Sequence, residues 1–586
     1  MNQARLSRNP DKINKPNMNI RMNSMRSALW LPLAITLFNG AFACPGWSQE
    51  ASSLPRGHVF FETDFEAADA TRAWTRSTRL DGGFQSARAL AFTRGDNENS
   101  DTTLAELVLP VEPMRGHDVY LAAMIKAENV VETPARYHGL KFMTATVRDG
   151  EKIYVAANLG MATFDWKPVV FHARVPRDAT AFSLLVGLQG VSGKAWFDNV
   201  RILVRKPPRV SQPHAGPAYK GHDLPRLRGM QLSPGIAEES LRDLGRDWNA
   251  NVVRLQLVRR GAQAKGDPLD LAAYDRWLDA ELARLDATLR HCESHGLMAV
   301  IDLHSPPGGA RTPAGYIGTS GGLFTNPDCQ KKFVETWERI ARRYKDARSV
   351  WGYDLGNEPQ FLPDIAPERV FEGTAITLAT PLRKDGEGLD DWDDLATRAI
   401  RAIRAIDPDP AILFEPPNGY SPQGLAGFQP LDLPDIVYSV HMYVPSAFTH
   451  QGVHELQDRV PWMKKYHYPG EIDGQMWDKA RLEKALKPVI DFQKTHHVHI
   501  YIGEFSAIRW APDNSAYRYL KDLTDIFEEH GWDWTYHCFR EGWDGWSVEH
   551  GPDLENHSPS KQPTDRENLL REWFAKNRKP AWFRAP

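Results

Sequence analysis

Eight short apolar segments constrain the fold of the C-terminal part of the chain more strongly than any other feature of the sequence. They lie at residues 227–231, 252–255, 299–303, 351–355, 411–414, 436–440, 499–502 and 534–536. Between several of them, apolar residues recur at the spacing of an amphipathic helix. One such run extends from Leu271 to Leu289 and stops before Gly296. Eight strands that alternate with helices predict an α/β fold, a (β/α)8 barrel, over residues 226–586.

Residues 55–205 have a different pattern. Their apolar runs are short, alternate with polar residues and show no helical period. Examples lie at 58–61, 118–124 and 181–186. Turn signals such as Ser192-Gly193 separate the runs. This pattern predicts an all-β sandwich. The proline-rich stretch 206–225 is expected to be a linker to the barrel, so the chain is predicted to be multidomain.

Residues 1–48 are predicted to form a targeting segment. Arg21 and Arg26 precede an apolar run at 28–43, which is too short to span a bilayer comfortably, so no membrane span is expected. The end of this run, Ala41-Phe42-Ala43, has the small-x-small pattern of a signal peptidase site. We therefore expect a secreted or periplasmic protein. Cys44 directly follows the site, which leaves lipoprotein anchoring as the alternative.

Charge and cysteine content exclude several classes of function. Lysine plus arginine total 71 and aspartate plus glutamate total 75, so nothing favours a nucleic-acid or anionic-membrane partner. The four cysteines show no CxxC spacing and no Cys/His ligand pattern, which disfavours a zinc site and a disulfide framework. The 19 tryptophans and 17 tyrosines either stack on sugar rings or fill the cores, and both interpretations stay open. We expect a monomer.

Polar residues close several of the predicted barrel strands. In such barrels, side chains at the C-terminal strand ends line the active site, whatever the reaction. Any one of these residues could lack a catalytic task, but their agreement across several strands favours a common site. The residues are Arg254, His304, Asn357, Glu358, His441, Tyr443 and Glu504.

Glu358 and Glu504 follow two different strands, and two carboxylates placed in this way can flank a glycosidic bond. In a retaining glycosidase they lie ~5 Å apart, so that one attacks while the other protonates the leaving oxygen. The attacking carboxylate must stay ionised and the other must stay protonated. Arg254 could keep one of them ionised through its charge, and a purely structural Arg254–glutamate pair is the alternative. This chemistry requires no catalytic metal and no cofactor.

Motifs within residues 226–546 resemble those of glycoside hydrolase family 5. In chain order they are Asn251 with Arg254, Asp302-Leu303-His304, Asn357-Glu358-Pro359, His441-x-Tyr443 and Ile502-Gly503-Glu504-Phe505. Asn-Glu-Pro alone occurs in unrelated proteins, whereas the order of the whole set is specific. The resemblance implies a (β/α)8 barrel enzyme that cleaves β-linked glycans with net retention.

The resemblance also implies a role for each matching residue. Glu358 would be the acid/base, and Glu504 would be the nucleophile. Asn357 would hydrogen-bond the 2-hydroxyl of the sugar at the cleavage point, and Tyr443 would hold Glu504 in line for attack. Three further residues would bind sugar hydroxyls or orient the carboxylates: Arg254, His304 and His441.

The sequence departs from the family pattern in its last strand, where the family usually places a tryptophan under the sugar. His537 falls about where that tryptophan is expected. Trp543 and Trp546, in the loop that follows, are the candidates to supply the ring. We expect His537 and Trp543 to be substrate-binding residues.

Four other carboxylates have simpler interpretations. Glu415 follows the fifth strand, where a structural or substrate-binding role is favoured over a catalytic one. Asp302 and Asp354 lie inside strands and are expected to pair within the barrel. Glu541 lies in a loop and could contact a distal sugar.

The front domain resembles the jelly-roll carbohydrate-binding modules at its two ends, residues 60–66 and 196–200. Such modules often hold a structural Ca²⁺ between acidic residues, and Glu62, Asp64 and Asp198 are candidate ligands. A sandwich that only braces the barrel is the alternative to one that binds glycan.

Together these patterns predict a retaining glycosidase, first of all an endo-β-glucanase or cellulase, with a polysaccharide or oligosaccharide as its partner. β-Mannan or a related hemicellulose is the other expected substrate class. Two alternative functions remain: a non-catalytic glycan-binding protein on a barrel scaffold, and a transglycosylase or glycoconjugate hydrolase. The presence of both carboxylates argues against the first alternative, while the second depends on loop shape.

Overall fold

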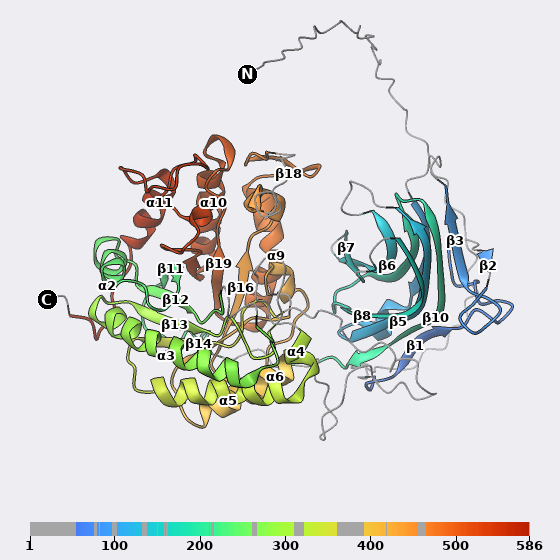
Figure 1. Cartoon of the computed structure of the whole chain (residues 1–586), viewed down its shortest axis with the longest axis horizontal. Coiled ribbons are helices and arrows are strands. Elements are labelled where there is room, and N and C mark those ends of the chain that lie inside the picture. The colour runs from blue at the N-terminus through green and yellow to red at the C-terminus, as the bar shows by residue number, and fades with distance from the viewer. Residues whose placement is uncertain are drawn as a thin grey trace, which may run out of the picture. The chain divides into compact units, whose positions relative to one another are not determined.

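The computed structural model describes residues 54–584, except for 76–78, 81, 96–101, 132–137, 149, 158, 160–161, 210, 212–215, 261–265, 310–320, 360–391, 418 and 454–464 (Figure 1). The predicted targeting segment 1–48, with Cys44 and its lipoprotein alternative, lies outside the described residues. No helix in the described part combines the length and the apolar character needed to cross a bilayer. Cys292, Cys329 and Cys538 are buried free thiols.

The part of the chain before the linker forms two antiparallel sheets. The first contains β1 (Val59–Thr63), β2 (Arg79–Leu80), β3 (Leu90–Arg94), β5 (Asp118–Val130), β8 (Ala162–Arg174) and β10 (Gly193–Lys206). Its order is β2-β3-β10-β5-β8, with β1 paired to β10. The second contains β4 (Thr102–Leu109), β6 (Gly139–Arg148), β7 (Glu151–Ala156) and β9 (Ala181–Gln189), in the order β4-β9-β6-β7. A short helix, α1 (Val111–Met114), lies between β4 and β5.

The two sheets share one hydrophobic cluster. Leu121 and Phe197 of the first sheet, and Phe142 and Leu184 of the second, are all buried in it. Every second side chain of a strand points to the same face, which is why the sequence alternates between apolar and polar residues here. The region consists of antiparallel β-sheets, as an all-β domain requires, and the predicted sandwich of jelly-roll type stays a prediction.

Eight parallel strands close into a barrel in chain order (Figure 1). They are β11 (Arg228–Leu232), β12 (Val252–Gln256), β13 (Met298–Asp302), β14 (Val350–Asp354), β15 (Ala411–Phe414), β16 (Ile436–Met442), β19 (Ile500–Phe505) and β20 (Asp533–Tyr536). The barrel closes where β20 pairs with β11, with Trp534 opposite Arg228. Each strand overlaps one of the eight segments singled out in the sequence, so the predicted (β/α)8 barrel is confirmed.

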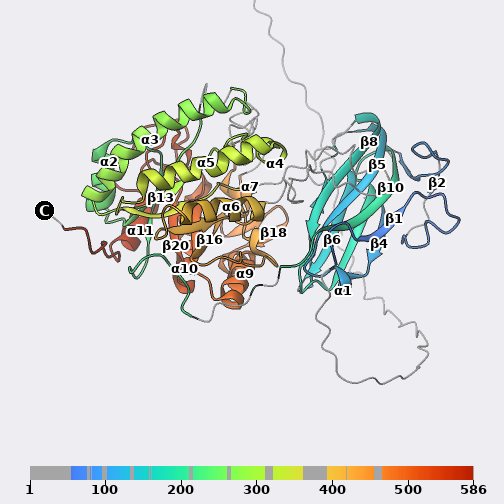
Figure 2. The same cartoon turned by 90° about the horizontal axis from the view of Figure 1, so that it is seen from below.

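Helices surround the barrel strands. The longer ones are α3 (Leu271–Ser294), α5 (Pro327–Tyr344), α6 (Trp392–Arg404), α9 (Lys479–His496), α10 (Ser515–His530) and α11 (Asp565–Phe574). Shorter elements are α2 (Glu238–Arg242), α4 (Gly321–Thr325), α7 (Ser446–Thr449) and the hairpin of β17 (Gly470–Ile472) and β18 (Gln475–Trp477). Figures 1 and 2 both place α3, α5 and α6 side by side along the barrel. Two of these helices begin at aspartate caps: Asp270 accepts a hydrogen bond from Ala273 N–H, and Asp478 accepts one from Arg481 N–H.

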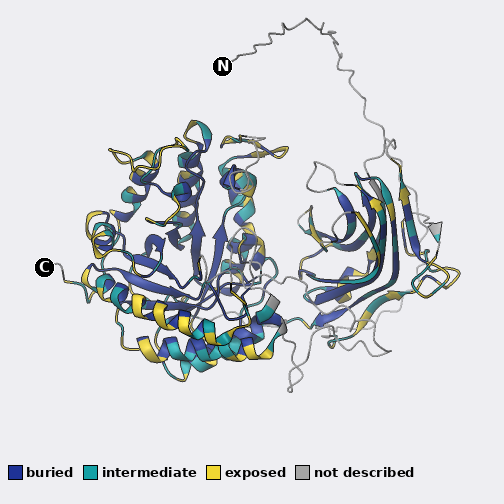
Figure 3. Cartoon of the chain, in the orientation of Figure 1, coloured by how far each residue is buried: buried dark blue, intermediate teal, exposed yellow. Residues whose placement is uncertain are grey.

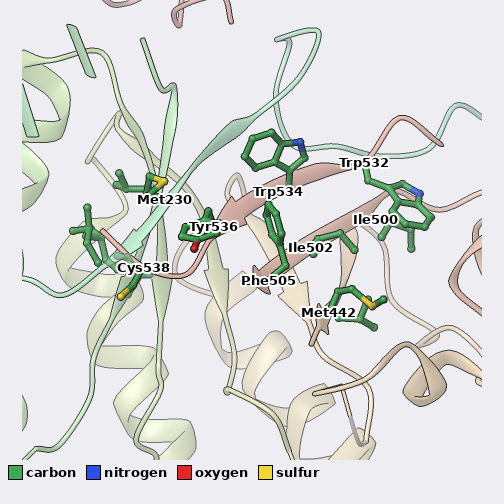
Figure 4. Close-up of a cluster of buried hydrophobic side chains, with 14 of the residues drawn as sticks. Met230, Met442, Ile500, Ile502, Phe505, Trp532, Trp534, Tyr536 and Cys538 are labelled. Atoms are coloured by element: carbon green, nitrogen blue, oxygen red, sulfur yellow. The ribbon is translucent and has the colours of Figure 1, made fainter. Parts of the chain in front are cut away.

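The barrel has two apolar layers. One fills the space between strands and helices, and Figure 4 shows part of it around Ile502, Phe505 and Trp534. The other fills the barrel interior near the N-terminal ends of the strands, with Val252 and Tyr501 among its members. Figure 3 shows the barrel strands as buried, whereas the helices expose their outer faces. The interior is therefore a packed core, and a site can open only at the other end.

Candidate active site

The polar side chains of the site follow from the alternation along the barrel strands. Val252 of β12 and Val300 of β13 lie in the interior apolar cluster, and two residues later on the same strands stand Arg254 and Asp302. Since the strands are parallel, their C-terminal ends meet at one mouth of the barrel. The buried polar residues near these ends are Gln231, Arg254, Asp302, Asp354, Glu415, His441 and Glu504.

Arg254 lies at the centre of this group and is fully buried. Its guanidinium contacts side-chain oxygens of six residues: Gln231 and Glu504 at 2.7 Å, Asp354 at 2.9 Å, Asn357 at 3.1 Å, Asp302 at 3.2 Å and Glu415 at 3.3 Å. Burial opposes its charge, but the surrounding carboxylates raise the pKa of Arg254 well above its ordinary value. Arg254 is therefore a permanent cation that draws the C-terminal strand ends together.

Glu504 ends its strand in a cationic environment. Its Oε1 accepts a hydrogen bond from Arg254 at 2.7 Å, and its Oε2 accepts one from the Tyr443 hydroxyl at 2.8 Å. Burial disfavours the charged form, yet neighbouring cations, His441 and Arg254 among them, hold the pKa of Glu504 well below its usual range. Glu504 is consequently a carboxylate near neutral pH.

Glu358 follows β14 and has an unusual backbone. Its φ of 46° lies in the left-handed region, which is uncommon for residues other than glycine. Its N–H donates to Oε2 of Glu415 at 2.8 Å, and its Oε1 lies 2.8 Å from Nδ1 of His441. Its side chain is 18% exposed, against 8% for Glu504, so both carboxyl groups reach the mouth while Glu358 is the more open.

The two glutamates are close together. A carboxylate oxygen of Glu358, one of Glu504 and a ring nitrogen of His441 all lie within 4.8 Å of one another. Tyr443 and Arg254 hold Glu504, while His441 and Glu415 hold Glu358. The structure thus brings together two carboxyl groups with different partners and different exposure.

Asn357 and His304 lie beside this pair. Oδ1 of Asn357 accepts a hydrogen bond from Arg254, so the amide NH₂ group points away from the guanidinium. Nδ1 of His304 lies 2.8 Å from Asp302, which fixes the plane of the imidazole ring. Asp302 also contacts Arg254, so both aspartates expected to pair within the barrel, Asp302 and Asp354, do so with this arginine.

His537 occupies the end of β20 beside aromatic rings. The ring of Trp546 lies 6.0 Å from it and 6.1 Å from the ring of Tyr443. Burial lowers the pKa of His537 to about 4, so the ring is neutral near neutral pH and adds no charge to Glu504. Trp546 is buried, whereas Trp543 packs edge-on against it at 5.5 Å and is 43% exposed. Of the two tryptophans, Trp543 therefore offers the open ring.

The structure adds detail on three further residues near the site. Gln231, on β11, accepts a hydrogen bond from Arg254 and carried no motif that could have identified it. Glu415 was expected to be structural or substrate-binding, and the structure places it in contact with Glu358, His441 and Arg254. Its position directly after β15 was the available signal. Glu541 contacts Ser233 and Arg260.

The three candidate calcium ligands are not brought together as one group among the described residues. Glu62 pairs with Arg201 at 3.8 Å. Asp198 is buried and accepts hydrogen bonds from Phe84 N–H at 2.7 Å and from the Ser86 hydroxyl at 3.0 Å. Protein donors therefore already occupy the Asp198 carboxylate.

A second cluster of metal-ligand type lies near the N-terminal ends of the barrel strands. Nε2 of His222 and Nε2 of His499 lie 2.8 Å and 2.7 Å from the same oxygen of Asp533. These are hydrogen-bond distances, and the other Asp533 oxygen accepts from Leu227 N–H. Since the N-terminal end of such a barrel is distant from its mouth, this cluster reads as a structural tie across the barrel base.

Comparison with known proteins adds independent information. The sequence model of the family Cellulase (glycosyl hydrolase family 5) matches residues 218–542. Endoglucanase C of Acetivibrio thermocellus is 27% identical over 277 residues, which are 44% of this chain and 72% of that protein. Cellodextrinase A of Ruminococcus flavefaciens is 24% identical over 304 residues, 51% of this chain and 77% of that protein. The crystal structure of an endoglucanase of Thermotoga maritima aligns with a TM-score of 0.41 and 21% identity, covering 59% of this chain and 96% of that one.

Proposed function

The chain belongs to glycosyl hydrolase family 5 and is a glycosidase, and from that membership we propose that it cleaves β-glucan chains internally by double displacement, with Glu504 as nucleophile and Glu358 as acid/base. The single observation that carries the mechanism is the approach of the two carboxyl groups to within 4.8 Å, oxygen to oxygen. Retaining glycosidases place these groups about 5–5.5 Å apart, whereas inverting enzymes need about 6.5–9.5 Å to admit a water.

In the first step, an oxygen of Glu504 attacks the anomeric carbon while Glu358 gives its proton to the leaving oxygen. The bond between the anomeric carbon and the leaving oxygen breaks, and a glycosyl ester of Glu504 forms. Arg254 and Tyr443 fix the nucleophile, so little reorganisation is needed when charge moves off its carboxylate. Glu358, the more exposed of the two glutamates, is the one able to reach a leaving group.

In the second step, Glu358 takes a proton from water, and the resulting hydroxide equivalent attacks the anomeric carbon of the ester. Glu504 leaves as a carboxylate, which its cationic neighbours stabilise. Two inversions give net retention. Asn357 and His304 would bind sugar hydroxyls beside the reacting carbon, because Asn357 contacts Arg254 and His304 contacts Asp302, which itself pairs with Arg254.

The names of the relatives support the choice of substrate. One is an endoglucanase and another a cellodextrinase, so a β-glucan is the first substrate proposed for this chain. The exposed ring of Trp543 would stack on a sugar, because aromatic faces suit the apolar faces of pyranose rings. His537 would line the sugar site that it approaches beside Tyr443 and Trp546.

The remaining features of the proposal concern the whole protein. We propose export, on the basis of the targeting pattern in residues 1–48, and a monomeric enzyme. The two antiparallel sheets would form a jelly-roll module, with their shared core as the supporting observation. The glycan is the only partner that the proposal requires.

Two variants test the roles of the glutamates. Glu504→Gly should reduce hydrolysis to background, because no covalent intermediate can form. Glu358→Ala should lower kcat/KM on an unactivated β-glucan by about 10²–10⁴-fold, the usual contribution of a general acid. Azide should then partly restore turnover of an activated aryl glycoside by Glu358→Ala and yield a β-glycosyl azide. Wild-type turnover by a folded Glu504→Gly protein would overturn the nucleophile assignment.

A further inference from the structure

Glu415 is a buried carboxylate that the mechanism above does not use. It directly follows β15, and its side chain is fully inaccessible. Its Oε2 accepts the backbone N–H of Glu358 at 2.8 Å, while its Oε1 lies 3.1 Å from Nε2 of His441 and 3.3 Å from Arg254. A buried charge without a function would be costly, and each oxygen of this one has a defined partner.

The contact with the Glu358 backbone fixes an unfavourable conformation. The left-handed region is strained for residues with a side chain, because Cβ comes too close to the following carbonyl oxygen, so the φ of 46° at Glu358 needs a local partner to persist. An ionised carboxylate is the strongest acceptor that the N–H of Glu358 could have. The backbone conformation of Glu358, and with it the direction in which its side chain points, therefore depends on Glu415.

Glu415 also acts on the side chain of Glu358, through His441. His441 lies between the two residues: Nε2 is at the ion-pair distance of 3.1 Å from Oε1 of Glu415, and Nδ1 lies 2.8 Å from the Glu358 carboxyl group. Burial opposes a charge on this ring, but the carboxylates of Glu415 and Glu504 raise the pKa of His441 well above its ordinary value. The charged and titratable groups that face or approach the ring from the packed elements are Glu358, Glu415, Glu504 at 3.8 Å, and His537.

We propose that Glu415 is a positioning residue for the acid/base: it anchors the backbone of Glu358 with one oxygen and, with the other, keeps both nitrogens of His441 protonated. The inference rests on the function proposed above. With a proton on Nδ1, His441 donates to Glu358 and cannot accept the proton that Glu358 must deliver to the leaving group. No proton is gained or lost by Glu415 in the cycle, and no substrate atom contacts it.

The proposal predicts a defect that depends on the leaving group. Glu415→Gln keeps the size of the side chain and removes its charge. On an unactivated oligosaccharide, which needs proton donation, we expect kcat/KM to fall about 10–100-fold, part of the full contribution of a general acid. On a dinitrophenyl β-glycoside of the same sugar, whose leaving group needs no proton, kcat/KM should fall by less than about threefold. Equal losses on the two substrates would overturn the proposal.

Asp354→Asn is the matched control. Asp354 is also a buried carboxylate on Arg254, at 2.9 Å, but no hydrogen bond or ion pair in the described part of the chain joins it to Glu358 or His441. Its removal should affect both substrates equally, because it acts through Arg254 and the nucleophile. A preference of Asp354→Asn for the activated substrate as large as that of Glu415→Gln would show that replacing any carboxyl group on Arg254 has this effect, and would refute the specific role.

A double-mutant cycle separates positioning from general damage. If Glu415 acts through Glu358, adding Glu415→Gln to Glu358→Ala should change kcat/KM on the unactivated oligosaccharide less than about twofold, although Glu415→Gln alone costs about 10–100-fold there, since the residue it serves is gone. Independent, multiplied losses would contradict the proposal. A fluorosugar that labels Glu504 counts the folded sites in each variant, so misfolding cannot imitate the result. Failure of the glutamate variants described under the proposed function would sink that function, whereas failure of this cycle alone would sink only the role of Glu415.

Discussion

Each oxygen of the Glu504 carboxylate has its own donor, Arg254 on one side and Tyr443 on the other. A nucleophile held in this way is oriented before substrate arrives, and both bonds favour its anionic form. The two donors differ in one respect. Arg254 also ties other strand ends together, whereas the Tyr443 hydroxyl donates to Oε2 of Glu504.

Tyr443→Phe isolates the contribution of that hydroxyl. A hydrogen bond to a charged group is worth about 1.5–3 kcal/mol, so kcat/KM should fall about 10–100-fold while the ring packing against Trp546 is kept. Loss of a donor to the anion raises the pKa of Glu504. The acid limb of the kcat/KM profile should therefore move to higher pH, because the nucleophile becomes protonated, and so inactive, at a higher pH than in the wild type.

A pH–rate series of the wild type and Tyr443→Phe checks this, with the melting temperature as a control for folding. An acid limb that stays in place or moves to lower pH would contradict the role of the hydroxyl.

The working glutamates could be predicted from sequence because strand ends and motif order both pointed to them. The role of Glu415 could not, since it depends on which way the His441 ring faces and on the backbone conformation of Glu358. Neither property is written in residue type or spacing. His537 is similar: its position was predictable, but its low pKa follows from burial beside Trp546, which only packing determines.

At the scale of elements, β11 and β12 approach each other so closely that one residue of β11, Gly229, has no room for a side chain. A Cβ atom built on Gly229 would lie 1.7 Å from the carbonyl oxygen of Val252 on β12. Real Cβ atoms do not approach a backbone atom so closely. The first two strands of the barrel can therefore pair in this register only when position 229 is glycine.

Gly229→Ala should destabilise the barrel by several kcal/mol, on the order of the larger core-substitution effects, because backbone must move to admit the methyl group. Gly95→Ala is the matched control, since no atom of the described residues lies within 4 Å of the Cβ it would add. Denaturant unfolding of the two variants checks the difference. A Gly229→Ala protein as stable as Gly95→Ala would show that the two strands separate more easily than their pairing suggests.

The elements themselves were largely predictable. All eight barrel strands carry compact apolar runs, and α3, α5, α6 and α10 carry clear helical periods. Helix α9 was not predicted, although its buried residues Leu482, Leu486, Val489 and Phe492 are spaced as on a helix face. Pro488 inside that helix removes a backbone donor and disfavours a helix on sequence grounds alone, so tertiary packing decided the outcome.

At the scale of the whole molecule, the described residues form separate hydrophobic clusters in the two-sheet region and in the barrel. Each cluster is built from its own elements. Phe197 belongs to the first region, where its ring contacts Phe92 at 5.7 Å, and Phe527 belongs to the barrel, where its ring contacts Phe505 at 5.1 Å. A defect in one cluster should therefore not disturb the other.

Phe197→Ala should lower the melting temperature of the two-sheet region and leave hydrolysis at room temperature intact. Deleting a buried phenylalanine ring costs about 3–5 kcal/mol, enough to separate two transitions in a calorimetric scan. Phe527→Ala is the counterpart in the barrel. It should lower the melting temperature of the barrel, and the protein should lose activity at that same temperature. If both variants shift one common transition by the same amount, the two regions unfold as a single unit.

The contacts of Arg254 have a consequence for how the enzyme matures. Its partners lie on β11, β13, β14 and β19 or directly after β15, so the guanidinium cannot contact them all until distant parts of the chain have met. In a partly folded chain, or in one with a strand out of register, Arg254 would not contact Glu504, and the positive charge that keeps this carboxylate ionised would be missing. The enzyme can therefore become active only after the barrel has closed, and a measurement of turnover reports the fraction of chains that are correctly assembled.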